Sequence, residues 1–294
     1  MKTTLITGLS GFIGGHMVQF LKENHLDDSV IALSSHKIEG IETLCYALGH
    51  NLDDIVIPSS VTNVIHMGAW TPKSTSEANN IEASMSNIGF TNELLRKLNN
   101  HNIHQIVFLS TLDVYAPTCS AINEQSDVNP ISLYGDSKVF CEKMVMNWCK
   151  QHNAQSQILR IGHIYGEGEE QYKKIIPILF GKIIRGQEIE IFSDGQEKRS
   201  FLYVKEAVNY IWEAQSFQGD NVVNVVSGNA VSMLELAQTM VNIAHKSVPI
   251  RVLKKNMETR DMVFDNSHMQ SLFPINERSI LEGLEAEYNY MLRL

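Results

Sequence analysis

Hydrophobic and polar residues follow two distinct patterns along the chain. Short runs rich in β-branched residues, typical of buried strands, occupy residues 3–7, 29–33, 61–67, 106–110 and 157–161. Longer stretches with apolar residues at helical spacing lie at 12–23, 38–48, 77–98 and about 134–150. Because strands that alternate with helices predict parallel pairing through helical crossovers, we expect an α/β fold with a doubly wound parallel sheet (Rossmann).

The pattern becomes less regular after about Gly162. This half contains a polar loop at 193–198, a strand at 222–226 and a helix at 232–244. We therefore expect a Rossmann domain at 1–165, to which a strand and a helix near 200–228 return, and a smaller mixed α/β C-terminal lobe at 166–294. No internal repeat or low-complexity linker separates the two, so we expect them to pack together.

The composition excludes several classes of protein. The chain has 294 residues with 24 Lys+Arg against 33 Asp+Glu, a formal charge of -9, and no dense basic run, which argues against a nucleic-acid partner. Neither a signal peptide nor an apolar stretch of membrane-spanning length is evident, so we expect no membrane partner and a cytoplasmic location. The cysteines lack CxxC spacing and the histidines form no HExxH pattern, so we expect reduced thiols and no metal.

A glycine-rich turn follows the first predicted strand. The segment TGLSGFIGG places Gly8, Gly11 and Gly14 between that strand and the first helix, with GxxGxxG spacing instead of the more common GxGxxG. Glycines allow a tight turn and close approach of the backbone to a pyrophosphate, and the helix that follows offers unpaired N–H groups. The turn therefore predicts a dinucleotide site. Its other candidate contacts are Ser10, Phe12 and Ile13.

The end of the second predicted strand bears on which dinucleotide is bound. An NAD site has an acidic residue here that accepts hydrogen bonds from the adenosine ribose. This chain instead has Ser34, Ser35, His36 and Lys37. A carboxylate would repel a 2′-phosphate, whereas hydroxyls and a lysine can bind one, so we favour NADP(H), contacted by Ser34 and Lys37, over NAD(H). The alternative is a solvated turn in a protein indifferent to the phosphate.

One tyrosine among nine has a lysine four residues later. Tyr134 and Lys138 lie one turn apart on a predicted helix. A nearby ammonium favours the phenolate and lowers the pKa of the phenol, so the pair can pass a proton to or from a substrate oxygen. Ser110 and Thr111 end a strand at the carboxyl edge, where the Thr111 hydroxyl can polarise the same oxygen. The alternatives are a surface tyrosine with a solvated lysine, and a threonine that caps the strand.

Ordered motifs along nearly the full chain resemble those of the extended short-chain dehydrogenase/reductase family, which includes nucleotide-sugar epimerases, dehydratases and 4-keto reductases. The matches are, in chain order, TGLSGFIGG with TGxxGxxG, VIHMGA with VIHLAA, NIGFTNELL with NVxGTxNLL, STLDVYA with SSxxVYG, NPISLYGDSK with PxxxYGxSK, LRIGHIYGEG with LRxxNVYGP, GQEKRSFLYV with GxxxRDFIYV, and NVVSGNAVSMLELA with NIGSGxxxSxxELA.

The resemblance implies roles for the matching residues. Tyr134 and Lys138 take the proton-transfer pair, and Thr111 the hydroxyl that binds the substrate, a nucleotide-diphosphate sugar held by the lobe at 166–294. The residues expected at the dinucleotide are Gly8, Ser10, Gly11, Phe12, Ile13, Gly14, Ser34, Lys37, Gly68, Ala69, Asn87, Ser110, Tyr134, Lys138 and Ile161. Those expected at the substrate besides Thr111 are His163, Arg199 at the pyrophosphate, and Arg260, which with Asp265 belongs to a loosely matched segment. A homodimer through the helix that ends near Leu98 and the Tyr134 helix is also implied.

Departures from the family's pattern narrow the reaction. Dehydratases carry an Asp-Glu pair directly after the threonine, where this chain has Leu112 and Asp113. Leucine cannot transfer a proton, so we do not expect dehydration. The family's asparagine before IYG is His163 here, which either contacts substrate or is a buried histidine bonded to backbone, and the aspartate after Arg199 is Ser200.

Reduction of a 4-keto sugar and C4 epimerisation use the same three side chains. Since no acidic residue stands at Ser34, we expect an NADPH-dependent reductase of a nucleotide-diphosphate 4-keto-6-deoxyhexose. An NAD-dependent nucleotide-sugar 4-epimerase is the alternative. A non-catalytic NADP-sensing protein is disfavoured because Tyr134, Lys138 and Thr111 are all retained.

Overall fold

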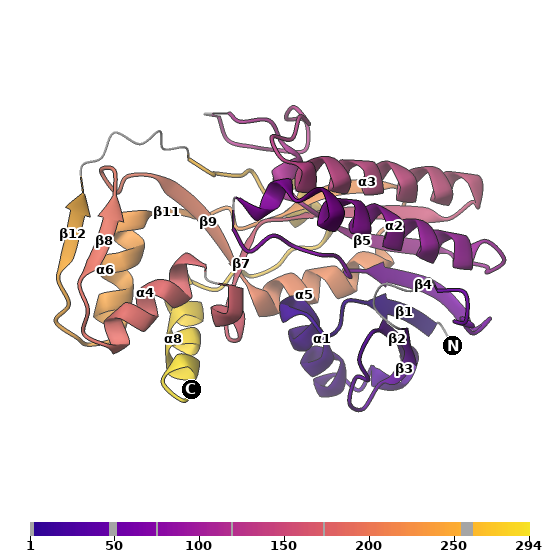
Figure 1. Cartoon of the computed structure of the whole chain (residues 1–294), viewed down its shortest axis with the longest axis horizontal. Helices are drawn as coiled ribbons and strands as arrows, with labels where there is room; N and C mark the ends of the chain where they lie inside the picture. The colour runs from indigo at the N-terminus through magenta and orange to yellow at the C-terminus, as the bar shows by residue number, and fades with distance from the viewer. Residues whose placement is uncertain (1–2, 47–51, 75, 119, 173, 254–260) are drawn as a thin grey trace. The chain divides into compact units, whose positions relative to one another are not determined.

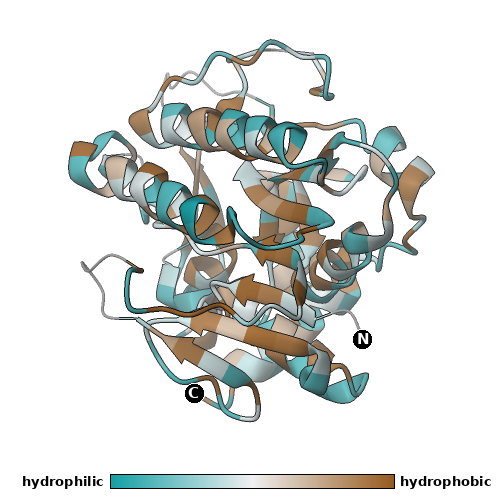
Figure 2. Ribbon diagram, turned by 90° about the vertical axis from the view of Figure 1, so that its right-hand side faces the viewer, coloured by the Kyte–Doolittle hydropathy of each residue, from teal (hydrophilic) through white to brown (hydrophobic). Residues whose placement is uncertain are grey.

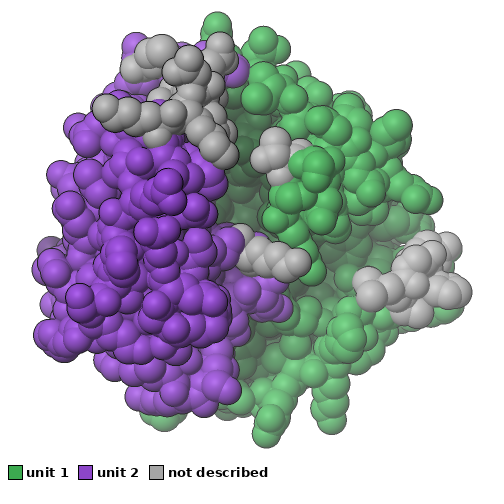
Figure 3. All heavy atoms as spheres, turned by 60° about the vertical axis from the view of Figure 1, so that its left-hand side comes forward, with its two compact units in different colours: residues 1–116, 126–161, 208–224 green, residues 117–125, 162–207, 225–294 purple. Residues whose placement is uncertain are grey.

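The computed structural model describes residues 3–46, 52–74, 76–118, 120–172, 174–253 and 261–294. The chain forms two compact units, coloured separately in Figure 3. Unit 1 comprises residues 1–116, 126–161 and 208–224. Unit 2 comprises residues 117–125, 162–207 and 225–294.

A seven-stranded sheet in the order β10-β6-β5-β4-β1-β2-β3 organises unit 1. Its strands are β1 (Thr3–Thr7), β2 (Val30–Ser34), β3 (Glu42–Cys45), β4 (Val61–His66), β5 (Gln105–Thr111), β6 (Gln155–Ile161) and β10 (Asn221–Val225). Every neighbouring pair from β3 to β6 is parallel. The order reverses between β1 and β4, which is the switch point where ligands of such sheets bind at the carboxyl ends. The predicted doubly wound fold is confirmed.

Three long helices of unit 1 cover this sheet: α1 (Phe12–Glu23), α2 (Ile81–Leu98) and α3 (Leu133–Gln151). α2 and α3 pack together on one face, with α1 on the other (Figure 1). Side chains fix where two of them begin, because Asn80 accepts from Ala83 N at the start of α2 and Ser132 accepts from Gly135 N at the start of α3. Hydrophobic residues concentrate in the strands and on the inner helix faces (Figure 2), where Leu5, Val64 and Leu94 are buried.

One predicted helix is wrong. Residues 42–45 of the expected helix at 38–48 form β3, which pairs in parallel with β2. Gly40 adopts a left-handed φ of 78°, which interrupts a helix at that point. Thr43 stabilises the turn, since its Oγ1 donates to Ile41 O and accepts from Ile38 N. Residues 47–48 lie outside the described part of the chain.

Unit 2 is a smaller mixed α/β body, as expected. A three-stranded sheet has the order β11-β9-β7, and a second sheet pairs β12 with β8. The strands are β7 (His163–Tyr165), β8 (Ile189–Phe192), β9 (Lys198–Tyr203), β11 (Ala230–Ser232) and β12 (Ile250–Leu253). The helices are α4 (Ile175–Ile184), α5 (Val204–Glu213), which continues into unit 1, α6 (Met233–Ile243), α7 (Ser267–Leu272) and α8 (Ile280–Met291).

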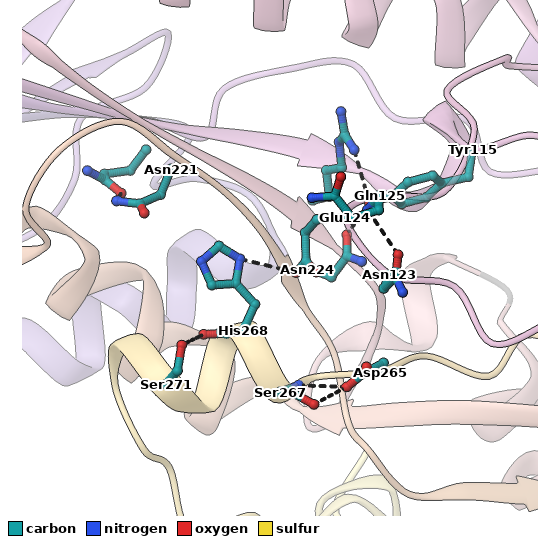
Figure 4. A network of polar contacts seen from close by, with 12 residues as sticks. Tyr115, Asn123, Glu124, Gln125, Asn221, Asn224, Asp265, Ser267, His268 and Ser271 are labelled. Atoms are coloured by element: carbon teal, nitrogen blue, oxygen red, sulfur yellow. Dashed lines mark hydrogen bonds and ion pairs between the residues drawn. The ribbon is translucent and has the colours of Figure 1, made fainter.

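The short segment 117–125 belongs to unit 2, which the sequence pattern does not indicate. Ile122 forms a parallel bridge with Phe264, and its backbone N donates to Val263 O. Glu124 lies 3.9 Å from His268 at the start of α7, where Asp265 also accepts from Ser267 (Figure 4). These contacts attach the segment to residues more than a hundred positions further along the chain.

A buried ion pair joins α3 to β6 within unit 1. Arg160 donates from Nε to Glu142 Oε1 at 3.1 Å and from Nη2 to Glu142 Oε2 at 2.9 Å. Arg160 also donates to the Tyr115 hydroxyl, which in turn donates to Asn224 Oδ1 on β10. Both charged side chains are almost completely buried.

The sequence led us to expect reduced cysteines and no membrane-spanning helix, and the structure bears on both for the described residues. In that part of the chain, Cys45, Cys141 and Cys149 are free thiols, and Cys119 lies outside it. None of the helices within the described ranges is long and apolar enough to cross a membrane.

Candidate active site

The glycine turn after β1 leaves no room for side chains at two positions. Gly8 has a φ of 83°, and a Cβ on it would lie 2.6 Å from Gly68 N. A Cβ on Gly14 would lie 2.1 Å from Gly8 O. Gly11 is the N-cap of α1 and supplies no side-chain hydrogen bond, so the first N–H groups of this helix point outward for a ligand. This cradle of backbone donors fits the pyrophosphate of a dinucleotide.

A chain of hydrogen bonds inside unit 1 ties the glycine turn to the loop after β4. Thr7 Oγ1 accepts from Gly68 N at 2.8 Å and lies 2.8 Å from His66 Nδ1. His66 Nε2 lies 3.1 Å from Thr91 Oγ1, whose proton goes to Asn87 O. His66 therefore donates from Nε2 and is neutral, which agrees with a pKa lowered to about 3 by burial and by the Lys138 charge.

Asn87 fixes the path of the same loop. Its Oδ1 accepts from Trp70 N at 2.7 Å and its Nδ2 donates to Trp70 O at 3.1 Å. The amide of this proposed dinucleotide contact is thus engaged with protein backbone and positions the loop. The ring of Trp70 then lies edge-on to Tyr134, with centroids 6.0 Å apart.

Tyr134 lies in the first turn of α3 and is 5% exposed. The side chains of Thr111 at the end of β5 and of Thr71 in the loop after β4 act on this phenol and lower its pKa. Burial, with a smaller effect of the Asp113 charge, raises the pKa of Tyr134 to about 12. This direction is opposite to the one expected from the sequence, because desolvation of the phenolate outweighs the effect of the Thr71 and Thr111 side chains.

Lys138 lies one turn further along α3 and is 3% exposed. Its Nζ donates to Leu109 O at 2.5 Å and sits 4.4 Å from the centre of the Phe108 ring. Burial lowers the pKa of Lys138 to about 8. Nearby, the buried Ser110 Oγ has no hydrogen-bond partner among the described residues, so this edge of the sheet can accommodate a polar group of a bound ligand.

The end of β2 carries no carboxylate. Ser34 is buried and its Oγ accepts from His36 N at 3.2 Å. Ser35 Oγ lies 2.9 Å from His36 Nδ1, and Lys37 is exposed. The turn is therefore held by serine hydroxyls beside a solvent-accessible ammonium.

The candidate substrate residues of unit 2 are only partly described. His163 on β7 is next to Phe201, with ring centroids 5.9 Å apart, and its Nδ1 has no hydrogen-bond partner among the described residues. Burial, then Arg199 and Lys174, lowers the pKa of His163 to about 4, so the ring is neutral. Arg199 forms an ion pair with Glu197. Arg260 lies outside the described residues, and Asp265 is engaged with Ser267.

A comparison of the sequence with family profiles decides the assignment. The profile described as "NAD dependent epimerase/dehydratase family" matches residues 4–226. The chain belongs to this family. The match includes the glycine turn, Thr111, Tyr134 and Lys138, and the resemblance stated from the motifs is confirmed.

Members of the NAD dependent epimerase/dehydratase family with different activities are similar to this chain. A protein of Methanocaldococcus jannaschii described as "putative UDP-glucose 4-epimerase" is 27% identical over 298 residues, which cover 98% of this chain and 97% of that one. A dTDP-4-dehydro-6-deoxy-D-allose reductase of Streptomyces bikiniensis is 24% identical, covering 97% and 94%.

A solved structure gives the same fold. A point mutant of the UDP-glucuronic acid 4-epimerase of Bacillus cereus, in complex with UDP-4-deoxy-4-fluoro-glucuronic acid and NAD, superposes with a TM-score of 0.85. Its sequence is 23% identical, and the alignment covers 100% of this chain and 99% of that one.

Unit 1 of this family member brings most of its predicted site residues to the carboxyl edge of the sheet. Thr111 and Ile161 are the last residues of β5 and β6 and lie opposite each other in register. Gly68 and Ala69 follow β4, where Gly68 touches Thr7, and Ser10, Phe12 and Ile13 surround the start of α1.

Sequence reasoning missed two residues of this site. The Thr71 side chain acts on the Tyr134 phenol, and its position five residues after the end of β4, in a loop at the carboxyl edge, is a signal that could have found it. Gly135 is the second: a Cβ on it would lie 2.5 Å from Asp113 O, so only glycine lets α3 start this close to the end of β5.

The glycine turn leads to a first prediction. Gly14→Ala should lower dinucleotide affinity by at least about tenfold and stability by roughly 1–3 kcal/mol, because the new methyl group meets backbone that cannot move aside. Gly15→Ala is the matched control, since nothing lies within 4 Å of a Cβ there. Affinity is measured by titration calorimetry and stability by thermal unfolding. Equal behaviour of the two variants would contradict the assigned cradle.

Proposed function

We propose that the protein is an NADPH-dependent reductase of a nucleotide-diphosphate 4-keto-6-deoxyhexose. The observation that carries the proposal is Tyr134, a buried phenol on which the Thr111 side chain acts and whose raised pKa keeps it protonated at neutral pH. A protonated phenol is the form that donates a proton to a keto oxygen. The serine and lysine end of β2 supports NADPH over NADH, because it offers donors and a positive charge to a 2′-phosphate.

The residues of the site have different roles in the proposed reduction. The glycine turn, Ser110 and Lys138 would hold the dinucleotide, which when bound supplies the hydride. Thr111 orients the sugar carbonyl by a hydrogen bond, and Tyr134 donates its proton to the carbonyl oxygen as that oxygen becomes a hydroxyl. Lys138 stabilises the phenolate that remains, since its ammonium lies one helical turn away and is poorly solvated. Arg199 and His163 are the proposed contacts of the nucleotide diphosphate and its sugar.

A nucleotide-sugar 4-epimerase is the second candidate. It is favoured by the nearly full-length similarity to the Methanocaldococcus jannaschii protein described as a putative UDP-glucose 4-epimerase. The same Tyr134, Lys138 and Thr111 would then take the proton of a C4 hydroxyl and return it to the same oxygen, while inversion at C4 would come from return of hydride to the opposite face of the keto sugar. Such an enzyme recycles its cofactor and needs no external reductant.

The experiment that separates the two follows absorbance at the NADPH band with a panel of nucleotide 4-keto-6-deoxyhexoses and of UDP-hexoses. The proposed reductase consumes one NADPH per product and gives a 6-deoxyhexose nucleotide. Interconversion of two UDP-hexoses with no loss of NADPH would replace the proposal by the epimerase. No reaction with any member of either panel would refute both.

Lys138 gives the proposed dinucleotide site a pH dependence. Its ammonium is present below the folded-state pKa of about 8 and is lost as pH rises through that value. If only the charged form binds, affinity for NADPH falls about tenfold between pH 7 and 9. Lys143→Met, which removes an exposed lysine of the same helix, should leave this fall unchanged. A constant affinity over that range would show that the ammonium does not take part.

A homodimer remains part of the proposal. Apolar side chains are exposed on α2 and near or on α3, namely Ile81, Met85, Ile131, Leu133 and Phe140. A second copy of the chain would cover this apolar face. A sedimentation mass equal to two chains is the expected result, and a mass of one chain would refute it.

A further inference from the structure

Two strand ends meet at the switch point of the large sheet. β1 ends at Thr7 and β4 ends at His66, and these two residues lie opposite each other in register. The strand order reverses between β1 and β4, so ligands of such a sheet bind beside this pair of strand ends. Both side chains are buried, so they can act on a ligand only through the groups around them.

The hydrogen bonds around His66 run in one direction. The Thr91 hydroxyl donates its single proton to Asn87 O at 2.9 Å, so toward His66 Nε2, which lies 3.1 Å away, its oxygen accepts. The ring proton is therefore on Nε2, and because the ring is uncharged at neutral pH, Nδ1 is left as an acceptor. Nδ1 lies 2.8 Å from Thr7 Oγ1 and takes the Thr7 proton. The Thr7 oxygen in turn accepts from Gly68 N at 2.8 Å.

Gly68 is the residue at which these bonds reach the proposed dinucleotide site. A Cβ on Gly8 would lie 2.6 Å from Gly68 N, so the glycine turn and the loop after β4 are in backbone contact. A Cβ on Gly68 would lie 3.0 Å from Thr7 Oγ1. Because neither glycine has a side chain, the bond between Thr7 and Gly68 N sets where the loop lies against the turn.

We propose that His66 is a positioning residue for the dinucleotide, acting through Thr7 and Gly68. By accepting the Thr7 proton, its Nδ1 directs the Thr7 oxygen to Gly68 N and so keeps the loop after β4 at the separation from the glycine turn that a bound dinucleotide requires. In this role His66, which is 2% exposed, contacts neither the dinucleotide nor the sugar. The inference rests on the proposed function only in that a dinucleotide binds here, so it applies to a 4-epimerase as well.

A purely structural role of His66 makes a different prediction. The ring also packs against Phe90 and Phe108, at centroid distances of 5.5 and 5.4 Å. If the ring only fills this space, every substitution that removes it lowers stability, and dinucleotide affinity falls along with stability. If His66 positions the loop, affinity depends on which of its two nitrogens is replaced.

Asparagine and glutamine separate the two nitrogens. An asparagine amide reaches about as far as Nδ1 and can accept from Thr7, whereas a glutamine amide reaches about as far as Nε2 and meets Thr91. Both variants lose the ring, so urea unfolding should show similar losses of stability. In titration calorimetry with NADP⁺ and with NAD⁺, His66→Asn should keep its affinity within about threefold of the wild type, and His66→Gln should lose about tenfold or more. Equal affinities of the two variants would overturn the positioning role.

A matched pair of threonine variants tests the same role from outside the ring. Thr7→Val and Thr91→Val each remove one buried hydroxyl bonded to His66, so both should lower stability. Only Thr7→Val releases Gly68 N, so it should lower dinucleotide affinity by about tenfold or more, and Thr7→Ser, which keeps the hydroxyl, should retain it. Thr91→Val should bind within about threefold of the wild type. Affinity losses of equal size in the two valine variants would refute the role.

A third measurement needs no ligand, because it locates the proton on the wild-type ring. With ¹⁵N-labelled histidine, two-bond proton–nitrogen correlations distinguish a ring protonated at Nε2 from one protonated at Nδ1, and the spectrum of either His66 variant identifies the signal. At neutral pH the proton should be on Nε2. A proton on Nδ1 would overturn the role, because Thr7 could not then donate to the ring. A wild type that binds neither dinucleotide would instead refute the proposed function, and this role with it.

Discussion

Replacing Tyr134 by phenylalanine should lower kcat by at least about two orders of magnitude while the fold stays intact. The ring remains, so it still packs edge-on to Trp70 and fills the same buried position at the start of α3. Only the hydroxyl is lost, and with it the group on which the Thr71 and Thr111 side chains act. Turnover is measured as NADPH consumption, and the fold by circular dichroism and thermal unfolding.

Tyr290→Phe provides the matched control for this loss. Tyr290 lies near the end of α8 in unit 2 and is part of no proposed step, so the variant should turn over as the wild type does. If the kcat of Tyr134→Phe stayed within about threefold of the wild-type value, Tyr134 would not be the proton donor. The dinucleotide fold would be unaffected by that result.

Removing Glu142 should cause a large loss of stability in unit 1. Glu142→Ala leaves the Arg160 guanidinium buried without its carboxylate, which costs about 3–5 kcal/mol of unfolding free energy. Both bonds of this pair are short, at 3.1 and 2.9 Å, and both side chains are nearly inaccessible to water. The loss also weakens the contacts of Arg160 with Tyr115 and, through it, Asn224 on β10.

Urea unfolding measures this effect against an exposed ion pair in the same unit. Glu93 on α2 pairs with Arg96 at 2.7 Å, but both side chains are partly solvated. Glu93→Ala should therefore change stability by no more than about 1 kcal/mol. Replacing both buried partners, as Glu142→Leu with Arg160→Met, should recover much of the loss because no unpaired charge remains. Equal losses for Glu142→Ala and Glu93→Ala would contradict this account.

Most strands of the sheet in unit 1 could be predicted from the sequence because they are buried on both faces. β1 and α1 have the predicted bounds, and β4, β5 and β6 differ from the prediction by a few residues at their ends. Buried parallel strands give continuous apolar runs, and the helices between them carry a regular apolar stripe. Both signals are strong over short windows of sequence.

Elements whose conformation depends on contacts with distant residues could not be predicted from local sequence patterns. β3 is an edge strand with partly exposed residues, so its pattern gives no continuous apolar run, and its pairing with β2 decides its conformation. Segment 117–125 joins unit 2 through Phe264 and His268, which no local pattern foretells. Tertiary contacts outweighed local propensity in both cases.

In the candidate site, too, features with a local sequence signal could be predicted, whereas features that depend on tertiary contacts could not. Spacing identified Tyr134 and Lys138, and strand ends identified Thr111, because these signals are local in the sequence. The raised pKa of Tyr134 depends on burial, which the spacing of two residues does not contain. Likewise, the engagement of Asn87 with the Trp70 backbone arises from a loop that folds back onto α2.

The interleaving of the two units constrains how the chain can be synthesised and divided. Each unit is assembled from three separate stretches, and the third stretch of unit 1 ends only at residue 224. A ribosome must therefore deliver residues up to 224 before the outer strand of the large sheet can form. No uninterrupted gene fragment encodes either unit by itself, so a truncation at any single point removes part of both or leaves one without its last piece.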